Sequence, residues 1–403
     1  MANVLPDSHK RFDQFSMSYR KAPKSLAHSS YNDVYTKTQA SRRSRVAVKS
    51  DDAEQLNRTF LIRTLLLAVM LVTFSWLSSP ARAADVTLRL HSFLPPSSTV
   101  PKQILRPWAK KVEEASDGRI KIQHFDSMAL GGKPPSLMDQ ARDGVVDITW
   151  TLLGYTPGRF PRSEVLELPF LMEDPVATSL AFWDLVEEDF SKNEFKSVKV
   201  LGAWVHGPGV LHSKEPIRSL EDMKGLKLRG PTRVINDYFK EIGAVPLGLP
   251  LPAVPEALSR GVISATALPW EVTPAVKLSE LVGNHSELKG PQALYTATLV
   301  LVMNKARYNN LPDDLKAILD AESGAKLSGF GGRVQYAADG AARKIAQDAG
   351  NDFHEISSKD YDAWKQAAQP VYDRWIADMT KKGIDGQALI EKARERIKAH
   401  RKP

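Results

Sequence analysis

Residues 225–243, GLKLRGPTRVINDYFKEIG, combine a short strand pattern with the start of an amphipathic helix. Leucine alternates with lysine and arginine in LKLR, as in a β-strand with one buried face. Pro231 then opens a segment whose apolar residues recur at helical spacing: Val234, Ile235, Tyr238, Phe239 and Ile242. The stretch therefore predicts a strand that ends at Arg229 and a helix that follows it directly.

The same alternation of strand and helix patterns extends in both directions. The expected strands are 85–93, 119–125, 145–153, 198–205, 244–249, 262–268 and 293–303. The expected helices are 104–118, 135–144, 231–243, 252–261, 312–348 and most of the chain from 358 onward. This pattern is typical of an α/β fold with parallel strands and helices on the sheet faces. Glycines at 329–332 predict a bend in the long helix, where it crosses between two lobes.

Residues 58–83 have the order of a secretory signal peptide. Two arginines precede an apolar run over 64–76, and the small-residue sequence Ala-Arg-Ala follows at 81–83. The run is shorter than the roughly 20 residues of a membrane span. We expect cleavage before Ala84 and a mature protein in the periplasm; an uncleaved anchor helix is the alternative. Residues 1–57 show no apolar periodicity and are expected to be a disordered leader or a start codon assigned too early.

Composition narrows the possible functions. Residues 1–83 contain 13 Lys and Arg but 6 Asp and Glu, which leaves 42 basic and 41 acidic residues in the mature chain. A nearly neutral chain lacks the basic character that nucleic-acid binding requires, so we expect no such partner. The chain has no cysteine, which excludes disulfides, thiolate metal sites and cysteine nucleophiles.

The sequence gives little support to catalysis. No HExxH spacing indicates a zinc site, and no GxSxG stretch marks a nucleophilic serine. GFGGR at 329–333 lacks the preceding strand of a dinucleotide-binding loop. We therefore expect no enzyme activity, no catalytic residues, no cofactor and no protein-built metal site, and leave open whether an ion joins a bound ligand.

Arg229 is the main candidate for a binding residue. Ligands of open α/β sheets bind beyond the carboxyl ends of strands, and the N-terminus of the next helix also favours an anion there. A guanidinium offers two parallel donors that match a carboxylate; a surface arginine is the alternative. Arg233, one turn later, is either a second cation or faces solvent. Other strand ends supply expected cleft residues: Ser92, Phe93, Trp150, Leu152, Leu251, Leu268 and Trp270.

Over about 300 residues the mature chain resembles the substrate-binding proteins of tripartite ATP-independent periplasmic (TRAP) transporters, of the DctP type. The resemblance rests on LRLHSFLPPSSTV (88–100), ARDGVVDITWTLLGYTPGRFP (141–161), SLEDMKGLKLRGPTR (219–233) and GAVPLGLPLPAVPEALSRGVISATALPWE (243–271). It implies two α/β lobes, each a sheet flanked by helices, and a long helix that spans both. The expected boundaries are 84–206 with 295–334 for lobe I, and 207–294 with 335–403 for lobe II.

The resemblance also implies a function. The arginine of the KGLKxR segment, here Arg229, forms a salt bridge with the ligand carboxylate, and the receptor delivers its solute to a TRAP-type membrane permease. SATALP (264–269) replaces the DGQENP of many relatives, so Leu268 stands where a polar contact is common. Gly209 falls near a second arginine of sialic-acid-binding relatives. We therefore expect a monomeric receptor for a hydrophobic or aromatic monocarboxylate; a receptor that feeds a sensor, and a periplasmic hydrolase, are the alternatives.

Overall fold

The computed structural model describes residues 58–67 and 85–401. Contacts divide the chain into Met1–Ser79 and Pro80–Pro403. In the first unit, residues 58–67 form an exposed helix within the expected signal peptide. The expected cleavage site at 81–83 and the leader over 1–57 lie outside the described residues. Within the described ranges, none of the helices is both long enough and apolar enough to cross a membrane.

The second unit contains a five-stranded sheet with the order β2-β1-β3-β10-β4. Its strands are β1 (Val86–Ser92), β2 (Ile120–Phe125), β3 (Ile148–Leu152), β4 (Val198–Val205) and β10 (Thr298–Asn304). β1 pairs in parallel with β2 and β3, whereas β10 runs antiparallel to β3 and β4. The helices around this sheet are α2 (Arg106–Ala115), α3 (Leu137–Arg142), α4 (Pro175–Glu188), α7 (Lys305–Asn309) and α8 (Asp313–Ala321).

A second sheet has six strands in the order β11-β9-β5-β8-β6-β7. Its strands are β5 (Val210–Ser213), β6 (Lys227–Gly230), β7 (Val245–Gly248), β8 (Ala265–Leu268), β9 (Asn284–Leu288) and β11 (Asp352–Ile356). β6 is parallel to β7 and β8, and β5 is antiparallel to β8 and β9. The remaining long helices are α5 (Arg233–Glu241), α6 (Val254–Ser259), α10 (Ser358–Gln366), α11 (Gln369–Lys381) and α12 (Gly386–His400).

Single turns of helix connect many of these elements. They are η1 (Val100–Leu105), η2 (Pro134–Ser136), η3 (Leu153–Tyr155), η4 (Ser163–Glu167), η5 (Phe190–Lys192), η6 (Glu221–Met223), η7 (Leu251–Ala253), η8 (Trp270–Val276) and η9 (Leu278–Glu280). η1 is a π-helical turn that leads directly into α2, and the others are 3-10 turns. Several of them, η3, η7 and η8 among them, follow the strand ends where the sequence predicts a binding site.

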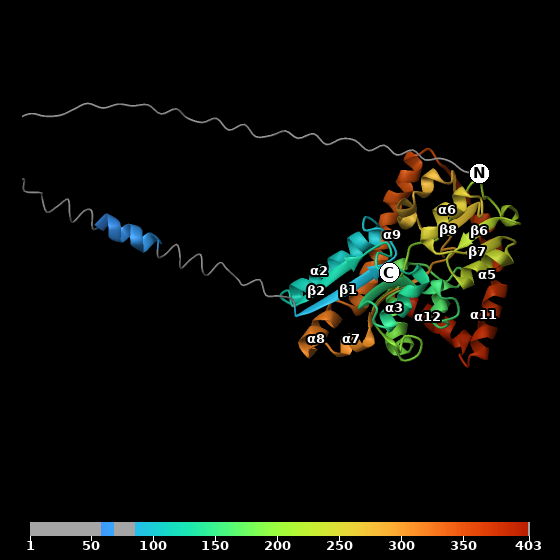
Figure 1. Cartoon of the computed structure of the whole chain (residues 1–403). Helices are drawn as coiled ribbons and strands as arrows, with labels where there is room; N and C mark the ends of the chain where they lie inside the picture. The colour runs from blue at the N-terminus through green and yellow to red at the C-terminus, as the bar shows by residue number, and fades with distance from the viewer. Residues whose placement is uncertain (1–57, 68–84, 402–403) are drawn as a thin grey trace, which may run out of the picture. The chain divides into compact units, whose positions relative to one another are not determined.

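Two lobes result because the chain passes from one sheet to the other more than once. β4 and β5 are joined by four residues but belong to different sheets. β9 and β10, which are also consecutive, belong to different sheets as well. A helix, α9 (Gly324–Asp348), contacts β4 of the first sheet and η8 beside the second, and so spans both lobes (Figure 1). The α/β class and the two-lobed architecture are thus confirmed. The residue boundaries of the two lobes stay a prediction. The predicted boundaries lie in these two connections and within α9.

The βαβ pattern predicts purely parallel sheets, but each of the two sheets contains antiparallel pairs. β10 and β5 run antiparallel to their neighbours because the chain enters each sheet from the other lobe. Three strands, β5, β9 and β11, have no counterpart in the sequence prediction. β9 and β11, NHSEL and DFHEI, carry mostly polar residues without an apolar run, and β5 has four buried residues and no alternation.

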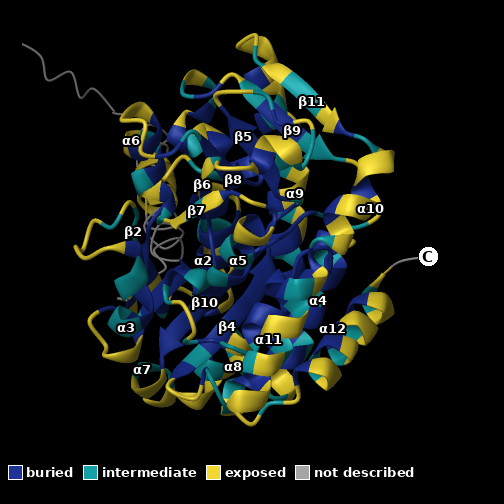
Figure 2. Cartoon of the chain, turned by 90° about the vertical axis from the view of Figure 1, so that its right-hand side faces the viewer, coloured by how far each residue is buried: buried dark blue, intermediate teal, exposed yellow. Residues whose placement is uncertain are grey.

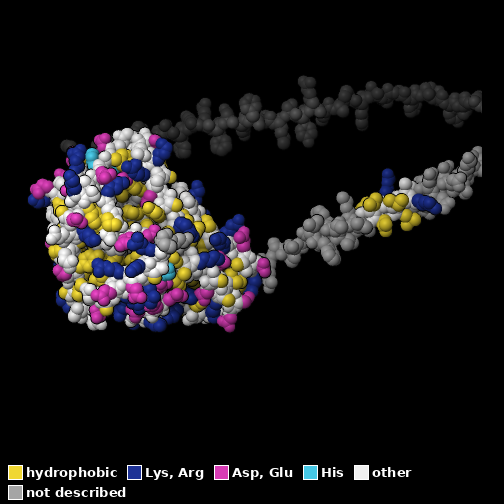
Figure 3. All heavy atoms as spheres, turned by 180° about the vertical axis from the view of Figure 1, so that it is seen from behind, with side chains coloured by type: hydrophobic (Ala, Val, Ile, Leu, Met, Phe, Trp, Pro, Cys, Tyr) yellow, Lys and Arg dark blue, Asp and Glu magenta, His cyan; other side chains and the backbone are white. Residues whose placement is uncertain are grey.

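The core follows the expected helical faces. In α5 the side chains of Val234, Ile235, Tyr238 and Phe239 are buried, as the spacing predicts. Figure 2 shows buried strands at the centre of each sheet and exposed turns on α11 and α12. On the face shown in Figure 3, Lys and Arg side chains lie among Asp and Glu side chains. That mixture agrees with the near-neutral composition of the mature chain.

The expected interruption of the long helix at Gly329–Gly332 is wrong. The break lies at residues 322–323, between α8 and α9, and α9 continues through the glycines. A Cβ atom on Gly331 would lie 2.7 Å from Cδ2 of Trp204, which is fully buried in β4. One on Gly332 would lie 2.9 Å from the carbonyl oxygen of Pro175 in α4. The glycines therefore allow α9 to pack closely against β4 and α4.

This packing can be tested within one helix. Gly331→Ala is expected to lower the free energy of unfolding by about 1–3 kcal/mol, because the new methyl group must displace a buried indole. Gly340→Ala is the matched control, since nothing lies within 4 Å of its new Cβ, and alanine there adds up to about 1 kcal/mol of helix propensity. Urea unfolding measures both variants. Equal stabilities would contradict the packing explanation.

Candidate functional site

Arg229 lies near the carboxyl end of β6, the strand next to the β7 edge of the second lobe's sheet. Its side chain is 1% exposed. Nε donates to the carbonyl oxygen of Leu249 at 2.9 Å, and Nη1 donates to that of Ala267 at 3.1 Å. Leu249 directly follows β7, and Ala267 lies near the end of β8. The strands on both sides of β6 therefore hold the guanidinium at the edge where their carboxyl ends meet. The predicted position of Arg229 is thus the observed one.

The Arg229 charge has no acidic partner within the described ranges. None of the ion pairs found there includes Arg229, and the side chains that oppose its desolvation are the phenols of Tyr155 and Tyr295. Burial lowers the pKa of Arg229, which the two hydroxyls partly counteract. The group still stays charged at neutral pH, because an arginine pKa starts above 12. A buried, uncompensated cation is costly, so this position favours a bound anion.

Arg229 lines a cavity between the two sheets of about 410 Å³, its opening included. The space inside it that a water-sized sphere can reach is about 40 Å³, so the two lobes close tightly around this cavity. Most of its wall is apolar. The lining residues are Phe93, Leu94, Trp150, Leu152, Tyr155, His206, Arg229, Pro231, Leu251, Ala267, Leu268, Pro269, Glu271, Val272, Tyr295, Leu299 and Gln335.

Aromatic rings from the first lobe form one side of the cavity. Phe93 stacks on Trp150 with ring centroids 4.8 Å apart and an interplanar angle of 12°. Tyr155 meets Phe93 edge to face, at 5.4 Å. Leu251 and Leu268 of the second lobe also line the cavity. Flat rings on one side and branched side chains among the other lining residues suit an aromatic or branched ligand.

Two tyrosines supply hydroxyl groups beside Arg229. The Tyr155 hydroxyl oxygen accepts the Leu251 N–H at 3.1 Å. The Tyr295 hydroxyl is buried and has no hydrogen-bond partner among residues 58–67 and 85–401. A Cβ atom on Gly209 would lie 2.0 Å from Cε1 of Tyr295, so any larger residue at 209 would displace this ring. A hydroxyl, not a second cation, therefore accompanies Arg229.

His206 contributes no competing charge. Its Nδ1–H donates to the carbonyl oxygen of Gly207 at 2.6 Å. Burial lowers the pKa of His206 to about 4, and the charge of Arg229 acts in the same direction. The imidazole is therefore neutral at neutral pH. Arg229 provides the cationic group of this cavity.

Two carboxyl groups lie at the α9 side of the cavity. Glu271 is the second residue of η8. Its backbone N–H donates to Oδ1 of Asp339 in α9 at 2.8 Å. Burial raises the pKa of Glu271 to about 7 and that of Asp339 to about 8. The nearby Glu271 carboxyl also raises the pKa of Asp339. Gln335, also in α9, donates from Nε2 to Oε1 of Glu271.

The structure brings together most of the residues expected from the sequence. Arg229, Phe93, Trp150, Leu152, Leu251 and Leu268 all line this cavity. Ser92 does not: its buried hydroxyl donates to Asp126 at 2.9 Å. Trp270 does not either: its indole packs against His212, His285 and Phe353, and Nε1–H donates to Glu287. Both side chains point away from the strand ends at which they were expected to line the cleft.

Several lining residues were not among the expected site residues. Tyr155 follows the end of β3 by three residues, which is a usable signal, whereas Tyr295 precedes β10 and has no such signal. Gln335 lies in the middle of α9, 106 positions from Arg229 along the chain, and no local pattern indicates it. Glu271 stands at a strand end but resembles a solvent-exposed carboxylate when the sequence is taken alone.

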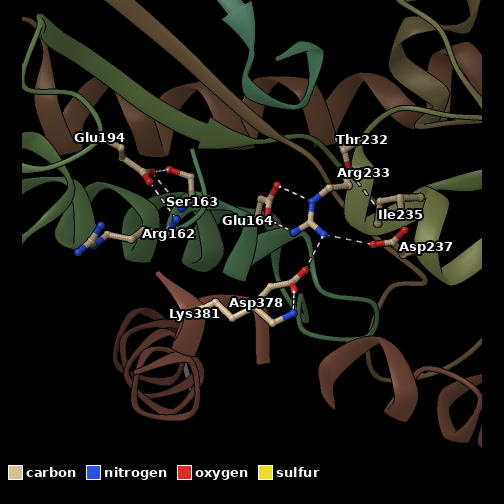
Figure 4. Close-up of polar contacts among 10 residues, drawn as sticks. All are labelled: Arg162, Ser163, Glu164, Glu194, Thr232, Arg233, Ile235, Asp237, Asp378 and Lys381. Carbon is tan, nitrogen blue, oxygen red and sulfur yellow. Dashed lines mark hydrogen bonds and ion pairs between the residues drawn. The ribbon is translucent and has the colours of Figure 1, made fainter. Parts of the chain in front are cut away.

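Arg233 is an ion-pair residue and does not line this cavity. Its Nη2 lies 2.5 Å from Oε2 of Glu164 in η4, and its Nη1 lies 3.3 Å from Asp237 and 3.5 Å from Asp378 (Figure 4). Glu164 is 8% exposed. The cluster joins α5 and α11, on the side of the second sheet, to η4, which packs on β10 of the first sheet. Arg233 thus connects elements of the two lobes.

A second hollow, of about 990 Å³, lies among α10, α11 and α12. Its cations, Lys365, Arg394, Lys398 and Arg401, are exposed, and Arg401 pairs with Glu173. Exposed charges are screened by water and do not need an anionic ligand. Over residues 58–67 and 85–401, no group of three or more His, Asp or Glu side chains is placed to hold a metal ion. The cavity at Arg229 is therefore the candidate binding site.

Known proteins that are similar to this chain are solute-binding proteins. A family model described as bacterial extracellular solute-binding protein, family 7 (DctP), matches residues 91–378. The chain is 48% identical to a TRAP solute-binding protein from Rhodoferax ferrireducens T118, crystallised with copurified benzoate. The match covers 78% of this chain and 98% of that one, with a TM-score of 0.76.

Two further relatives extend the comparison. A marine metagenome TRAP solute-binding protein, specific for aromatic acids and co-crystallised with 3-hydroxybenzoate, is 41% identical. That match covers 79% of this chain and all of the other, with a TM-score of 0.77. The C4-dicarboxylate-binding periplasmic protein DctP of Rhodobacter capsulatus is 24% identical over 300 residues, or 74% of this chain and 88% of that protein.

The pairing of Arg233 gives a prediction about stability. Arg233→Met is expected to lower the free energy of unfolding by about 1–3 kcal/mol, because it leaves the Glu164 carboxylate buried without a cation. Adding Glu164→Gln should recover part of that loss. Arg260→Met, which removes an exposed pair with Glu256, should change stability by less than about 0.5 kcal/mol. Guanidinium unfolding distinguishes these cases. An Arg233→Met protein as stable as the unaltered one would show that the pair contributes nothing.

Proposed function

Because the chain belongs to bacterial extracellular solute-binding protein family 7, the DctP family, we propose that it is a periplasmic receptor for an aromatic monocarboxylate. Arg229 binds the carboxylate, and the receptor delivers the solute to a TRAP-type membrane permease. The family is one of solute-binding receptors, and organic-acid binding is common to its named relatives. The receptor performs no chemistry on the solute.

The single observation that supports this proposal most is the buried, unpaired guanidinium of Arg229. Its Nε and one Nη1 proton are taken by carbonyl oxygens, which leaves donors on the distal edge of the fork for an anion. The hydroxyls of Tyr155 and Tyr295 add two polar groups beside it. A carboxylate is the anion whose two oxygens suit this set of donors.

The rest of the cavity favours an aromatic body. Phe93, Trp150 and Leu268 present apolar surface to the ligand, and such surface stabilises a buried ring by about 25 cal/mol per Å² removed from water. The Tyr295 ring fills the space beside Gly209, and Arg229 is the cation among the described lining residues, so a second carboxylate would find no cation there. Benzoate and 3-hydroxybenzoate are the ligands of two similar receptors, which supports the same class here.

Removing the guanidinium should abolish useful binding. Arg229→Met is expected to weaken binding of benzoate by about thirtyfold to several thousandfold, the equivalent of about 2–5 kcal/mol for loss of one partner of a buried charge pair. Arg229→Lys should recover part of the affinity, because an ammonium carries the charge without the two-pronged geometry. Isothermal titration calorimetry measures the three proteins.

Arg260→Met serves as the control, since it removes an exposed arginine outside the cavity. Circular dichroism checks that each variant is folded. A folded Arg229→Met protein with unaltered affinity for every acid tested would place the carboxylate elsewhere and overturn the assignment of Arg229.

The ligand class can be tested separately with a library of organic acids. Thermal-shift screening should give larger increases in melting temperature with benzoate, hydroxybenzoates and mandelate than with succinate, malate or sialic acid. The reason is that the cavity offers one cation and a mainly apolar wall. A strong response to dicarboxylates or sugar acids, with none to aromatic acids, would contradict the aromatic class.

A further inference from the structure

We propose that Glu271 recognises a hydroxyl group on the ligand's ring, so that the receptor distinguishes hydroxylated aromatic acids from unsubstituted ones. The proposal rests on the proposed function, since it assumes an aromatic carboxylate held by Arg229. It adds a second polar contact at a defined position in a cavity that is otherwise mostly apolar.

The position of Glu271 relative to Arg229 follows from the sheet. β6, in which Arg229 is the last residue but one, and β8, which precedes Glu271, are adjacent parallel strands. Their carboxyl ends therefore meet at one edge, and both side chains line the same cavity. Glu271 lies four residues beyond Ala267, whose carbonyl oxygen holds the guanidinium. The ring of a ligand whose carboxylate is held by Arg229 would therefore lie in a cavity that Glu271 also lines.

A chain of hydrogen bonds fixes the chemical character of Glu271. The buried indole of Trp204 donates from Nε1 to Oε1 of Gln335 at 2.6 Å. An indole can only donate, so this bond sets the orientation of the amide and turns Nε2 of Gln335 towards Glu271. The Glu271 carboxyl must therefore accept from Gln335. It retains lone pairs for a further donor, since a carboxylate has about four.

Glu271 has no cation within the part of the chain that the structure describes. The ion pairs found there do not include it, and its neighbours are Gln335, the Thr99 side chain and the Asp339 carboxyl. Glu271 is nevertheless buried, with only 5% of its surface exposed. A hydroxyl on the ligand ring can donate a further hydrogen bond to one of its remaining lone pairs, whereas an unsubstituted ring offers no donor.

This contact also accounts for Leu268. Its apolar side chain provides no partner for a polar group on the ligand, and the position three residues later provides one. A hydroxyl on the part of the ring beside Leu268 would find no polar partner in that side chain. The part beside Glu271 has an acceptor.

Calorimetry with benzoate, 3-hydroxybenzoate and 4-hydroxybenzoate tests the proposal. The unaltered receptor is expected to bind one of the hydroxylated acids at least tenfold more tightly than benzoate. Glu271→Leu should remove that preference, measured as the ratio of the two affinities in the same variant. Circular dichroism checks that the variant is folded. Glu271→Gln, which keeps the shape of the side chain, should give an intermediate preference.

Glu167→Gln is the matched control. Glu167 is likewise a buried carboxyl whose pKa is raised to about 7 by desolvation, but it accepts from Thr298 and does not line this cavity. It should keep the preference of the unaltered receptor. Equal binding of all three acids, or an undiminished preference in Glu271→Leu, would overturn the role of Glu271 and leave the receptor function standing. Failure of every aromatic acid to bind the unaltered receptor would overturn the proposed function, and this inference with it.

Discussion

The binding site depends on one electrostatic constraint, a buried guanidinium without an anion from the described part of its own chain. Desolvation of a charge costs several kcal/mol, and the Arg229 side chain recovers part of that cost from the carbonyl oxygens of Leu249 and Ala267. These contacts orient the group but do not neutralise it. In the function proposed above, a ligand carboxylate would complete the electrostatics, and the counterpart of this charge would arrive from solution.

The surrounding fold restricts which carboxylates would fit the cavity. The two sheets enclose the cavity from opposite sides, and α9 crosses behind it because its glycines permit close contact with Trp204. Trp204 in turn orients Gln335 and, through it, Glu271. The same close helix–strand packing that joins the lobes therefore sets the polarity of the cavity. Phe93 and Trp150 supply the apolar surface on the other side.

Much of this organisation is predictable from sequence, since it is local. The segment 225–243 predicts β6, α5 and the position of Arg229, because period-two and period-3.6 patterns follow one another without a gap. The parts that could not be predicted depend on distant residues. Gln335 and Tyr295 reach the cavity through the crossing of the lobes, Trp270 turns into a cluster with His212 and His285, and the glycines of α9 serve packing instead of a bend. β9 and β11 lack an apolar pattern because they are partly exposed.

The most direct measurement is a crystal structure of the receptor bound to an aromatic monocarboxylate. The account predicts both carboxylate oxygens on the guanidinium of Arg229, with the Tyr295 hydroxyl within hydrogen-bond distance and the ring beside Phe93 and Trp150. A ligand whose carboxylate contacts another cation, or which occupies the hollow among α10, α11 and α12, would contradict it.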